Sequence, residues 1–376
     1  MNKPEVKTAL VLGVGNAQVD LIRYLKVHGW RVIGCSYRHE GRGLADIDEF
    51  ILLNVTDVDG IERFVRAHHV DLIYTIGSDL AMPTIAQVSA RLGLPAFISS
   101  AAAVMLQNKL RLRFFLAEHN ISPVKFQAVR GQNDLDAWSY FPCIIKPVDN
   151  QGQRGVYMAH NMVEARAGIE NSLSHSRSQT LIIEEFLDGP EVSANTFISN
   201  GQTIFNEISD RLVVEGYAGG IPKGHIYPAK ACTGELLAET KALVERCNRE
   251  LAIMNGPVYY QLILTTNGPR IVEVTPRLDG CHMWRLIKRA CGVDLLDVCV
   301  RNLMGEELPP MDVKPGMDSY YLGFYYCPPA QQFILAEHQP VSEMEYLEYY
   351  YADGETVRPI NGYLEKVGYS IERLKF

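Results

Sequence analysis

The chain has 376 residues, which is more than one typical domain and enough for two or three, each with its own hydrophobic core. Hydrophobic residues make up 47% and charged residues 21% of the sequence, as is ordinary for a soluble globular protein. The formal net charge of -8 argues against a general nucleic-acid or membrane-surface binder, because such proteins carry basic patches.

The first residues and the cysteines indicate a cytoplasmic protein. The stretch MNKPEVKTALVLGVG has no apolar signal core followed by a small-residue cleavage site, and no apolar run elsewhere is a convincing membrane span. The 8 cysteines are scattered without a C-x-x-C pair, so we expect reduced thiols and neither a disulfide frame nor a zinc site. Cys281 is interpreted in the same way, as a structural thiol.

The first hundred residues alternate between strand and helix patterns. Short apolar runs predict strands, and apolar spacing of three and four residues predicts helices. The strands are expected at 8–14, 31–36, 46–55 and 70–76, and the helices at 17–28, 61–68 and 83–92. Such alternation predicts a parallel sheet covered by helices, that is, an α/β domain.

Gly13-Val14-Gly15, directly after the first strand, begins a dinucleotide-binding pattern but does not complete it. The third glycine of that pattern would fall at position 18, which is Gln18, and no acidic residue closes the second strand to hold a ribose. We therefore favour a tight turn that feeds a helix over an NAD site. The turn could still line a substrate cleft, because open sheets bind ligands beyond the carboxyl ends of their strands.

The rest of the chain mixes strand pairs with helices. Residues 108–120 form a basic helical pattern, residues 141–147 and 155–159 look like a hairpin around a glycine-containing loop, and 181–186 is a strand ending in carboxylates. Further strand pairs are expected at 191–198 with 203–208 and at 258–264 with 270–275, and helices at 234–251 and 281–305. Pro309-Pro310 marks a boundary, after which a small terminal module rich in tyrosine and proline follows.

Taken in order, six segments resemble the ATP-grasp superfamily over roughly residues 8–308, with the greatest likeness to carboxylate–amine ligases related to carbamoyl phosphate synthetase and biotin carboxylase. They are NKLRLRFFLAEHNISP, FPCIIKPVDNQGQRGV, LIIEEFLDGPE, GHIYPA, YYQLILTTNGPRIVEVTPRLDG and ACGVDLLD, and their order and spacing carry the resemblance. The resemblance implies a Rossmann-like α/β domain at 1–104, a two-lobed α+β ATP-grasp domain at 105–308 with a lid lobe at about 124–190, and a small C-terminal module at 309–376.

Two lysines and a glycine-containing loop match the phosphate-binding parts of this family. Lys109 from the first lobe and Lys146 from the lid would place positive charge against a triphosphate. The loop at 150–155 could fold its backbone N–H groups over phosphates, because Gly152 and Gly155 permit a close approach. Without the resemblance, Lys109 would be a surface charge on a solvated helix, and the loop an ordinary hairpin.

The segment LIIEEFLDGPE matches the family's hinge between lobes. The resemblance places the backbone of Glu185, Phe186 and Leu187 against the edge of the adenine, and the Glu184 side chain near its exocyclic amine. Glu191 matches the carboxylate that holds the ribose, and a carboxylate suits a diol because it accepts two hydroxyl donors. The alternative for Glu184-Glu185 is a solvated strand end.

The strand pair at 258–277 matches the family's metal centre, with one departure. The family presents an acidic residue on the first strand and E-x-N on the second, and these bind two Mg²⁺ ions that bridge the phosphates. Glu273 fits the second-strand carboxylate, but Gln261 and Thr275 stand at the other two positions. Both keep an oxygen that can coordinate Mg²⁺ or Mn²⁺, yet Gln261 removes a negative charge, so at least one ion should bind less tightly.

Several residues around the end of this strand pair match the substrate side of the family's site. Arg277 matches the arginine that steadies the acyl phosphate or its carboxylate precursor. His282 could act as a base, although a structural histidine is favoured. His225 belongs to a glycine-rich segment that is expected to be a loop, either closing over the substrate or flexible without contact to the chemistry.

The resemblance implies an enzyme that uses ATP and Mg²⁺ to activate a carboxylate as an acyl phosphate and to join it to an amine. The partners are small molecules, with neither nucleic acid nor membrane, and the C-terminal module could contribute a substrate wall or a homodimer surface. Gln261 and Thr275 keep a second interpretation open, an ATP-binding module with weak or lost turnover. An acceptor other than an amine is a third, and an NAD(P)-dependent enzyme built on Gly13 and Gly15 is a fourth and weaker one.

Overall fold

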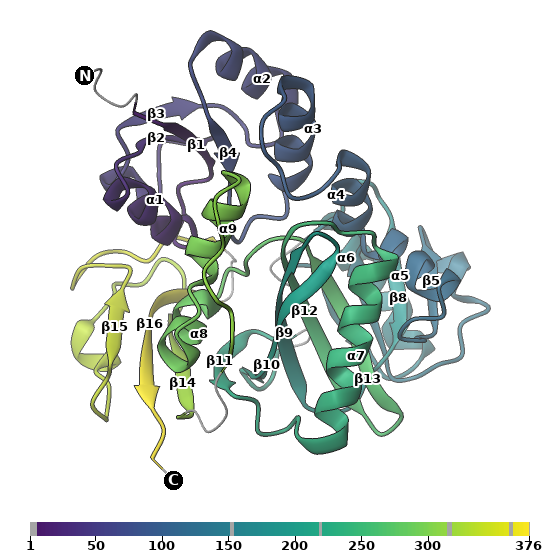
Figure 1. The fold of residues 1–376 in the computed structure, drawn as a ribbon. Coiled ribbons are helices and arrows are strands. Elements are labelled where there is room, and N and C mark those ends of the chain that lie inside the picture. Colours follow the sequence, from purple (N-terminus) through teal and green to yellow (C-terminus); the bar gives the residue numbers. More distant parts are fainter. Residues whose placement is uncertain (1–5, 151–153, 218–219, 314–317, 361–363, 376) are drawn as a thin grey trace, which may run out of the picture.

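The computed structural model describes residues 6–150, 154–217, 220–313, 318–360 and 364–375. In these residues the chain forms three sheets, each with its own helices (Figure 1). We name them sheet A, sheet B and sheet C in the order in which they begin along the chain. The α/β and α+β class predicted from the sequence is confirmed.

Sheet A is parallel and forms the N-terminal domain. Its strand order is β3-β2-β1-β4, so β1 lies inside the sheet, and β3 and β4 form its edges. Its elements are β1 (Thr8–Leu12), α1 (Gln18–Val27), β2 (Arg31–Ser36), η1 (Arg42–Ala45), β3 (Glu49–Leu52), α2 (Val58–Ala67), β4 (Leu72–Tyr74) and α3 (Met82–Leu92). The alternating pattern of the sequence predicted every strand and α-helix of this sheet, because β1 and β4 are mostly apolar and are buried along their whole length.

The turn after β1 is tight, and the side chain of Gln18 fills it. The Gln18 carbonyl oxygen accepts from the Gly15 N–H at 3.0 Å, and its amide donates to the backbone oxygen of Ile76. A β-carbon at Gly13 would lie only 3.1 Å from this side chain. The residue that replaces the third glycine of the dinucleotide pattern therefore occupies the concave side of the turn, which supports the tight-turn interpretation.

Sheet B is a small antiparallel sheet with the order β5-β8-β6-β7. Two helices, α4 (Ser100–Gln107) and α5 (Lys109–Glu118), lead from sheet A toward it, and α4 was not predicted. Its own elements are β5 (Phe126–Val129), η2 (Gln132–Leu135), β6 (Cys143–Pro147), β7 (Tyr157–Ala159), α6 (Met162–Ser174) and β8 (Leu181–Glu185). A separate hydrophobic core between α6 and the sheet makes this lobe a unit of its own, within the range predicted for the lid.

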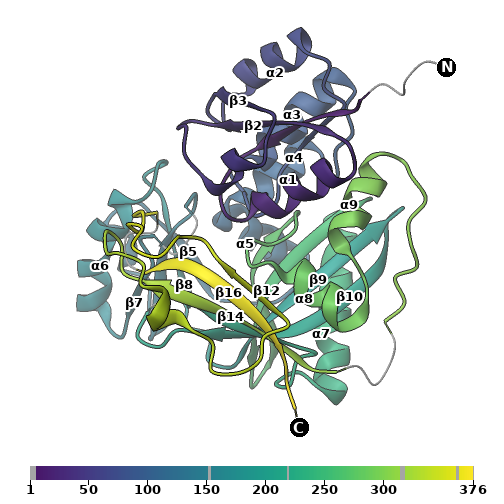
Figure 2. The same cartoon turned by 90° about the vertical axis from the view of Figure 1, so that its left-hand side faces the viewer.

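Sheet C has eight antiparallel strands in the order β13-β12-β9-β10-β11-β14-β16-β15. The first five strands are β9 (Glu191–Ser199), β10 (Gln202–Val213), β11 (Pro222–Tyr227), β12 (Gly256–Thr265) and β13 (Gly268–Thr275). The others are β14 (Tyr320–Cys327), β15 (Tyr346–Tyr349) and β16 (Glu365–Arg373), with η3 (Leu335–His338) between β14 and β15. Figure 2 shows β16 alongside β14 in this sheet. The C-terminal segment thus extends the sheet that precedes it, and sheet C crosses the boundary predicted at 308–309.

Three helices accompany sheet C, α7 (Gly234–Glu250), α8 (Met283–Cys291) and α9 (Leu295–Leu303). The region 281–305, expected to be helical, contains two of them, because Gly292 adopts a left-handed conformation with φ of +79° and Asp294 caps the next helix. The expectation of a loop around His225 is wrong, since this residue lies on β11 inside the sheet.

The N-terminal domain is joined to the rest by a buried polar cluster, which we call the junction network. Asp20 on α1 accepts from the ring nitrogen Nδ1 of His282 at 2.9 Å, from Trp284 at 3.0 Å and from Arg285 at 2.6 Å. On its other side, His282 shares a hydrogen bond of 2.8 Å with the hydroxyl of Tyr350. These contacts tie α1 to α8 and to the C-terminal strands, which also share one hydrophobic core with sheet A.

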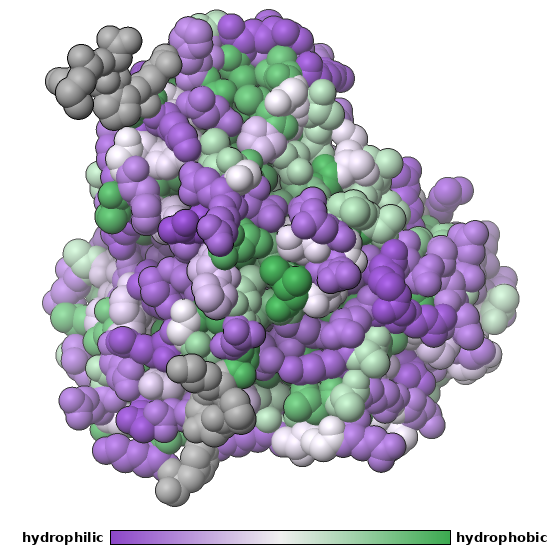
Figure 3. All heavy atoms as spheres, in the orientation of Figure 1, coloured by the Kyte–Doolittle hydropathy of each residue, from purple (hydrophilic) through white to green (hydrophobic). Residues whose placement is uncertain are grey.

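The face of the molecule seen in Figure 3 is mainly hydrophilic, with hydrophobic residues in scattered groups. Among the described residues, no helix combines the length and the apolar character needed to cross a membrane.

Candidate functional site

A cavity of about 1520 Å³ opens between sheet B and sheet C. Residues of β6 and β8 line it from the lid side, and residues of β9, β10, β12 and β13 from the other. Most of the residues predicted for the site lie on its wall. They are Lys109, Lys146, Glu184, Glu185, Phe186, Leu187, Glu191, Gln261 and Glu273. The structure therefore brings together side chains from both lobes that are more than 150 residues apart in the sequence.

Lys146, Glu184 and Arg113 form a buried charge cluster at the lid side of the cavity. Both Lys146 and Arg113 are in direct contact with the Glu184 carboxylate, and Arg113 also donates to the backbone oxygen of Ile271 at 2.6 Å. Burial alone would raise the pKa of Glu184, but the two cations outweigh burial and hold it at about 2. Burial lowers the pKa of Lys146, and Glu184 opposes this shift. Glu184 is thus no solvated strand end, and Arg113 is a site residue that the sequence prediction missed.

Lys109 links this cluster to the opposite wall. It is the first residue of α5, whose N-cap is the side chain of Asn108. Its backbone N–H donates to Val148 just beyond β6, and its ammonium donates to the backbone oxygen of Asn150 at 2.7 Å. The same ammonium lies 3.5 Å from a carboxylate oxygen of Glu273. Lys109 is therefore held in the cavity rather than on a solvated face, because α5 begins against the end of a lid strand.

The predicted phosphate loop is only partly described. Gly152 lies outside the described residues. Gly155 has a φ of +76°, and a β-carbon there would lie 2.8 Å from the β-carbon of His175. Any other residue at position 155 would be strained and crowded, so the backbone of this loop passes close to the lid helix.

The hinge residues 185–187 follow β8 and line the cavity. The backbone N–H of Glu185 donates to Lys125 and that of Phe186 to Pro142, both at 3.0 Å. These two hydrogen bonds fix the position of the chain just after β8.

Glu191 and Gln261 share a hydrogen bond that the sequence did not predict. The Gln261 amide donates to Glu191 at 2.8 Å, and the Arg211 guanidinium contacts the same carboxylate from β10. Gln261 also stands directly opposite Glu273 in the β12–β13 pair. The amide nitrogen of Gln261 thus faces Glu191. Its carbonyl oxygen remains as the atom that could coordinate a cation.

Thr275 lies two residues beyond Glu273 on β13, and so on the same face of the strand. It is buried, and the described residues provide no hydrogen-bond partner for its hydroxyl. Burial would raise the pKa of Glu273, but Lys109, Arg277 and Lys146 outweigh this effect and lower it. The carboxylate is therefore ionised, and carboxylate, amide and hydroxyl oxygens are the donors that a hard divalent cation requires. Of the three predicted metal residues, Glu273 and Gln261 line the cavity, and Thr275 is not among its lining residues.

Arg277 is buried at the end of this strand pair and is clamped by the N-terminal domain. Two of its guanidinium nitrogens donate to the two carboxylate oxygens of Asp79, each at 2.7 Å. Asp79 follows β4 in the segment Gly77-Ser78-Asp79, at the carboxyl end of a parallel strand, where open sheets place ligand-binding residues. That position was the available signal for Asp79, which sequence reasoning missed.

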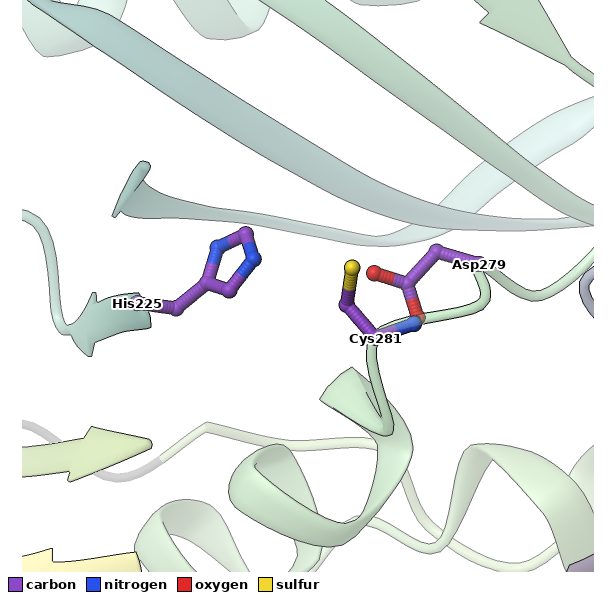
Figure 4. A group of neighbouring side chains, drawn as sticks. All are labelled: His225, Asp279 and Cys281. Carbon is purple, nitrogen blue, oxygen red and sulfur yellow. The ribbon is translucent and has the colours of Figure 1, made fainter. Parts of the chain in front are cut away.

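His282 is fully engaged in the junction network, and its ring stacks on Tyr369 at 4.1 Å between centroids. The structural interpretation favoured for His282 therefore agrees with its contacts. His225 and Cys281 lie close to each other and to Asp279, outside the residues that line the cavity (Figure 4).

Part of the chain is similar to a known domain family. Residues 139–284 match the ATP-grasp domain. The chain is 25% identical over 185 residues to dapdiamide A synthase of Enterobacter agglomerans, covering 46% of this chain and 43% of that protein. It is 26% identical over 315 residues to a formate-dependent phosphoribosylglycinamide formyltransferase of Bacteroides thetaiotaomicron, covering 81% of this chain and 79% of that protein. The chain thus spans less than half the length of the first of these relatives.

Solved structures share the whole architecture. The L-amino acid ligase from Bacillus licheniformis superposes with a TM-score of 0.79 at 17% identity, covering 99% of this chain and 94% of that one. Phosphoribosylglycinamide synthetase from Anaerococcus prevotii gives a TM-score of 0.75 at 18% identity, covering 99% of this chain and 95% of that one. At these identities the likeness establishes the fold, including the N-terminal domain and the C-terminal strands.

Proposed function

We propose that this chain, a member of the ATP-grasp superfamily, is an ATP-dependent ligase that activates a small carboxylate as an acyl phosphate and joins it to an amine. One observation carries the proposal. Lys109 and Lys146 come from different lobes and line the same cavity, beside Glu273. Two cations from opposite sides suit a polyphosphate that is bound between lobes. Several of the relatives are named ligases or synthases, which agrees with this reaction class.

The cavity has room for more than a nucleotide. At about 1520 Å³ it exceeds the ~300–1,000 Å³ typical of a site for one small molecule. We place the adenine at residues 185–187 and the ribose hydroxyls at Glu191. Because the N–H groups of Glu185 and Phe186 already donate to Lys125 and Pro142, recognition of the adenine would fall to the remaining backbone groups of this segment. Arg211 and Gln261 already contact Glu191, so a ribose would have to share this carboxylate with them. The remaining volume would hold the acid and the amine.

Glu273 would hold Mg²⁺, together with the carbonyl oxygen of Gln261 and, from the same face of β13, the hydroxyl of Thr275. The fit rests on an ionised carboxylate opposite an amide and on a buried hydroxyl with no partner among the described residues. Bound Mg²⁺ would neutralise phosphate charge as it accumulates during transfer. Because one carboxylate serves this position, we expect weaker binding than at a site with two.

In the first step a carboxylate oxygen attacks the γ-phosphorus of ATP, and the bond to the bridging oxygen breaks to release ADP. Lys109 and Lys146 stabilise the negative charge spread over the transferring group. In the second step the neutral amine attacks the acyl carbon, phosphate leaves, and the amine proton passes to water or to a carboxylate. Arg277 suits the acyl phosphate, but at least one of its two hydrogen bonds to Asp79 must be exchanged for one to the substrate.

The second candidate is a nucleotide-binding module without turnover. Gln261 and Thr275 favour it, because they reduce the charge available for the metal. Transfer to an acceptor other than an amine is a variant of the first proposal, since it shares the acyl phosphate.

A screen of carboxylic acids with hydroxylamine as a general nucleophile separates these functions. Hydroxylamine converts an acyl phosphate into a hydroxamate, so the correct acid should give equal amounts of ADP and hydroxamate with ATP and Mg²⁺. Adding natural amines in place of hydroxylamine then identifies the acceptor. ATP binding seen as a thermal shift, with no ADP for any acid, would favour the binding module instead. The variant Glu273→Ala should bind the nucleotide yet release no ADP, which excludes a contaminating ATPase.

A further inference from the structure

Three side chains with metal-binding atoms meet outside the cavity wall. His225 comes from β11, and Asp279 and Cys281 come from the turn between β13 and α8. One ligand atom of each lies within 4.8 Å of those of the other two. Figure 4 shows the Cys281 and Asp279 side chains next to each other, with the His225 ring directed toward them from the opposite side. The sequence did not predict this cluster, because 54 residues separate His225 from Asp279.

The polar atoms of this cluster are buried without adequate partners. His225 is 0% exposed, and neither of its ring nitrogens makes a hydrogen bond of good geometry among the described residues, although the backbone of Asp210 lies close to the ring. Asp279 is 2% exposed, and its second carboxylate oxygen lacks such a partner, whereas the first accepts the N–H groups of Cys281 and Met283. Buried polar groups are normally satisfied, so two incomplete side chains in one cluster indicate a missing ligand.

The chemistry of the three groups defines that ligand. Imidazole, thiolate and carboxylate are together the ligand set of Zn²⁺ and of similar transition-metal ions, and Mg²⁺ does not use sulfur. Four-coordinate zinc places its ligand atoms roughly 3.3–3.8 Å apart. The ligand atoms of the cluster already lie within 4.8 Å of one another, which is about 1 Å more than this spacing.

Two cationic side chains, Lys366 and Arg211, lie beside the cluster, and neither donates to the unpaired oxygen of Asp279. Lys366 donates to the Cys281 sulfur at 3.3 Å, and its ammonium also lies 3.7 Å from the centre of the Phe324 ring. Arg211 is paired with Glu191, so its charge is largely compensated.

We propose that His225, Asp279 and Cys281 bind a divalent transition-metal ion of the zinc class, at a position separate from the Mg²⁺ position assigned to Glu273. Three protein ligands leave a fourth coordination position for water or another small ligand. Cys281 is the half-buried member of the cluster, and therefore offers the ion its path to the site. This site does not depend on the ligase proposal, because it shares no ligand with the proposed phosphate-binding residues.

Titration of the reduced, metal-free full-length chain with Co²⁺, in the presence of excess Mg²⁺, tests the site. One equivalent of Co²⁺ should produce a thiolate-to-cobalt charge-transfer absorption, and one equivalent of Zn²⁺ should abolish it. Cys281→Ser should lose this band, and its affinity for the ion should fall at least about tenfold. The matched control Cys291→Ser, which changes another half-buried cysteine, should keep both the band and the affinity.

His225→Gln gives an independent measurement of the second ligand. We expect a weaker affinity for Co²⁺ by at least about tenfold, with the thiolate band retained at saturation. Because His225 is buried, the same samples are checked by thermal unfolding, where Zn²⁺ should raise the Tm of the wild-type chain but not that of Cys281→Ser. Absence of the band at one equivalent in the wild-type chain, or its persistence in Cys281→Ser, overturns the proposal.

Discussion

Two buried charge networks lie in different parts of this molecule and differ in what they leave unsatisfied. We call the group Lys109, Arg113, Lys146, Glu184 and Glu273 the cleft network, because all of its members line the large cavity. It holds three cations and two carboxylates, so positive charge remains for an anionic ligand. The junction network instead surrounds one carboxylate, Asp20, with donors from three other side chains, away from that cavity.

The difference teaches that burial of charge by itself does not indicate a binding site. Desolvation opposes the ionised form of both Glu184 and Asp20, and neighbouring cations outweigh it in both cases. The cleft network faces an open cavity and has an excess of positive charge, and is therefore suited to binding an anionic ligand. The junction network is closed on itself, and is therefore suited to holding domains together. Variants of the first should change catalysis, and variants of the second should change stability.

The largest effect is expected for Glu273→Gln. Removing this carboxylate takes away the proposed Mg²⁺ ligand, so we expect ADP formation to fall by about 10²–10³-fold, on the order of 3–4 kcal/mol of transition-state stabilisation. The free energy of unfolding should change by less than about 1 kcal/mol, since the side chain is partly exposed. Initial rates and urea unfolding measure the two quantities. A rate within a factor of two of the wild type would remove Glu273 from the active site.

Asp20→Ala should have the opposite pattern. It leaves Arg285, His282 and Trp284 without their shared acceptor, and breaking a buried pair in this way costs about 3–5 kcal/mol of stability. The kcat of the folded fraction should stay within about a factor of three. Asp59→Ala is a suitable control, because its ion pair with Arg91 is exposed and should contribute little to stability. Equal stability of the two variants would contradict the role of the junction network.

Lowering the pH should reduce the stability that the junction network contributes, over the range in which Asp20 is protonated. Burial alone would raise the pKa of Asp20, but His282 and Arg285 lower it from 3.8 to about 2. Because the folded-state pKa lies below the unfolded value, the stabilisation is fully present above about pH 4 and is lost as the pH falls toward 2. The contribution of Asp20 to the free energy of unfolding that is lost in this way is about 2 kcal/mol. The stability difference between wild type and Asp20→Asn, measured by urea unfolding, should shrink by this amount, whereas a constant difference would contradict the shift.

The smallest effect is expected for Gln261→Glu, which sharpens the metal assignment. A second carboxylate opposite Glu273 should strengthen Mg²⁺ binding by roughly tenfold, about 1.4 kcal/mol. The same change removes the hydrogen bond to Glu191, so the KM for ATP should rise modestly. The Mg²⁺ dependence of ADP release measures the first effect, with the exposed change Gln339→Glu as a control. Unchanged Mg²⁺ dependence would place Gln261 outside the metal site.

The sequence predicted the local elements well, because they depend on patterns within a few residues. Sheet A, the lid hairpin and the β12–β13 pair all follow from apolar spacing and turn residues. The β11 strand was mistaken for a loop because of Gly224, which in fact allows close packing, since a β-carbon there would lie 2.5 Å from the backbone oxygen of Leu322 and from the Tyr321 ring. Glycine in a strand often marks such a close approach rather than flexibility.

Within the site, the sequence predicted the residues that lie in family motifs, but it did not predict the residues that pair with them. Lys109, Lys146 and Glu273 lie in ordered segments that resemble the family. Asp79 clamps Arg277 from a position 198 residues earlier, and Arg113 meets Glu184 across 71 residues. These pairings depend on how domains pack together, and no local spacing encodes them.

The eight-stranded sheet C has a consequence for how this protein is made. Strand β14 pairs on one side with β11 and on the other with β16, which ends at Arg373. A chain that is still being synthesised cannot complete this sheet, nor the core that sheet A shares with β14 and β16, until residues up to Arg373 have emerged from the ribosome. The edge of β11 stays unpaired until β14 has been made, and the edge of β14 until β16 has been made, so the nascent protein is vulnerable to edge-to-edge aggregation until β16 pairs.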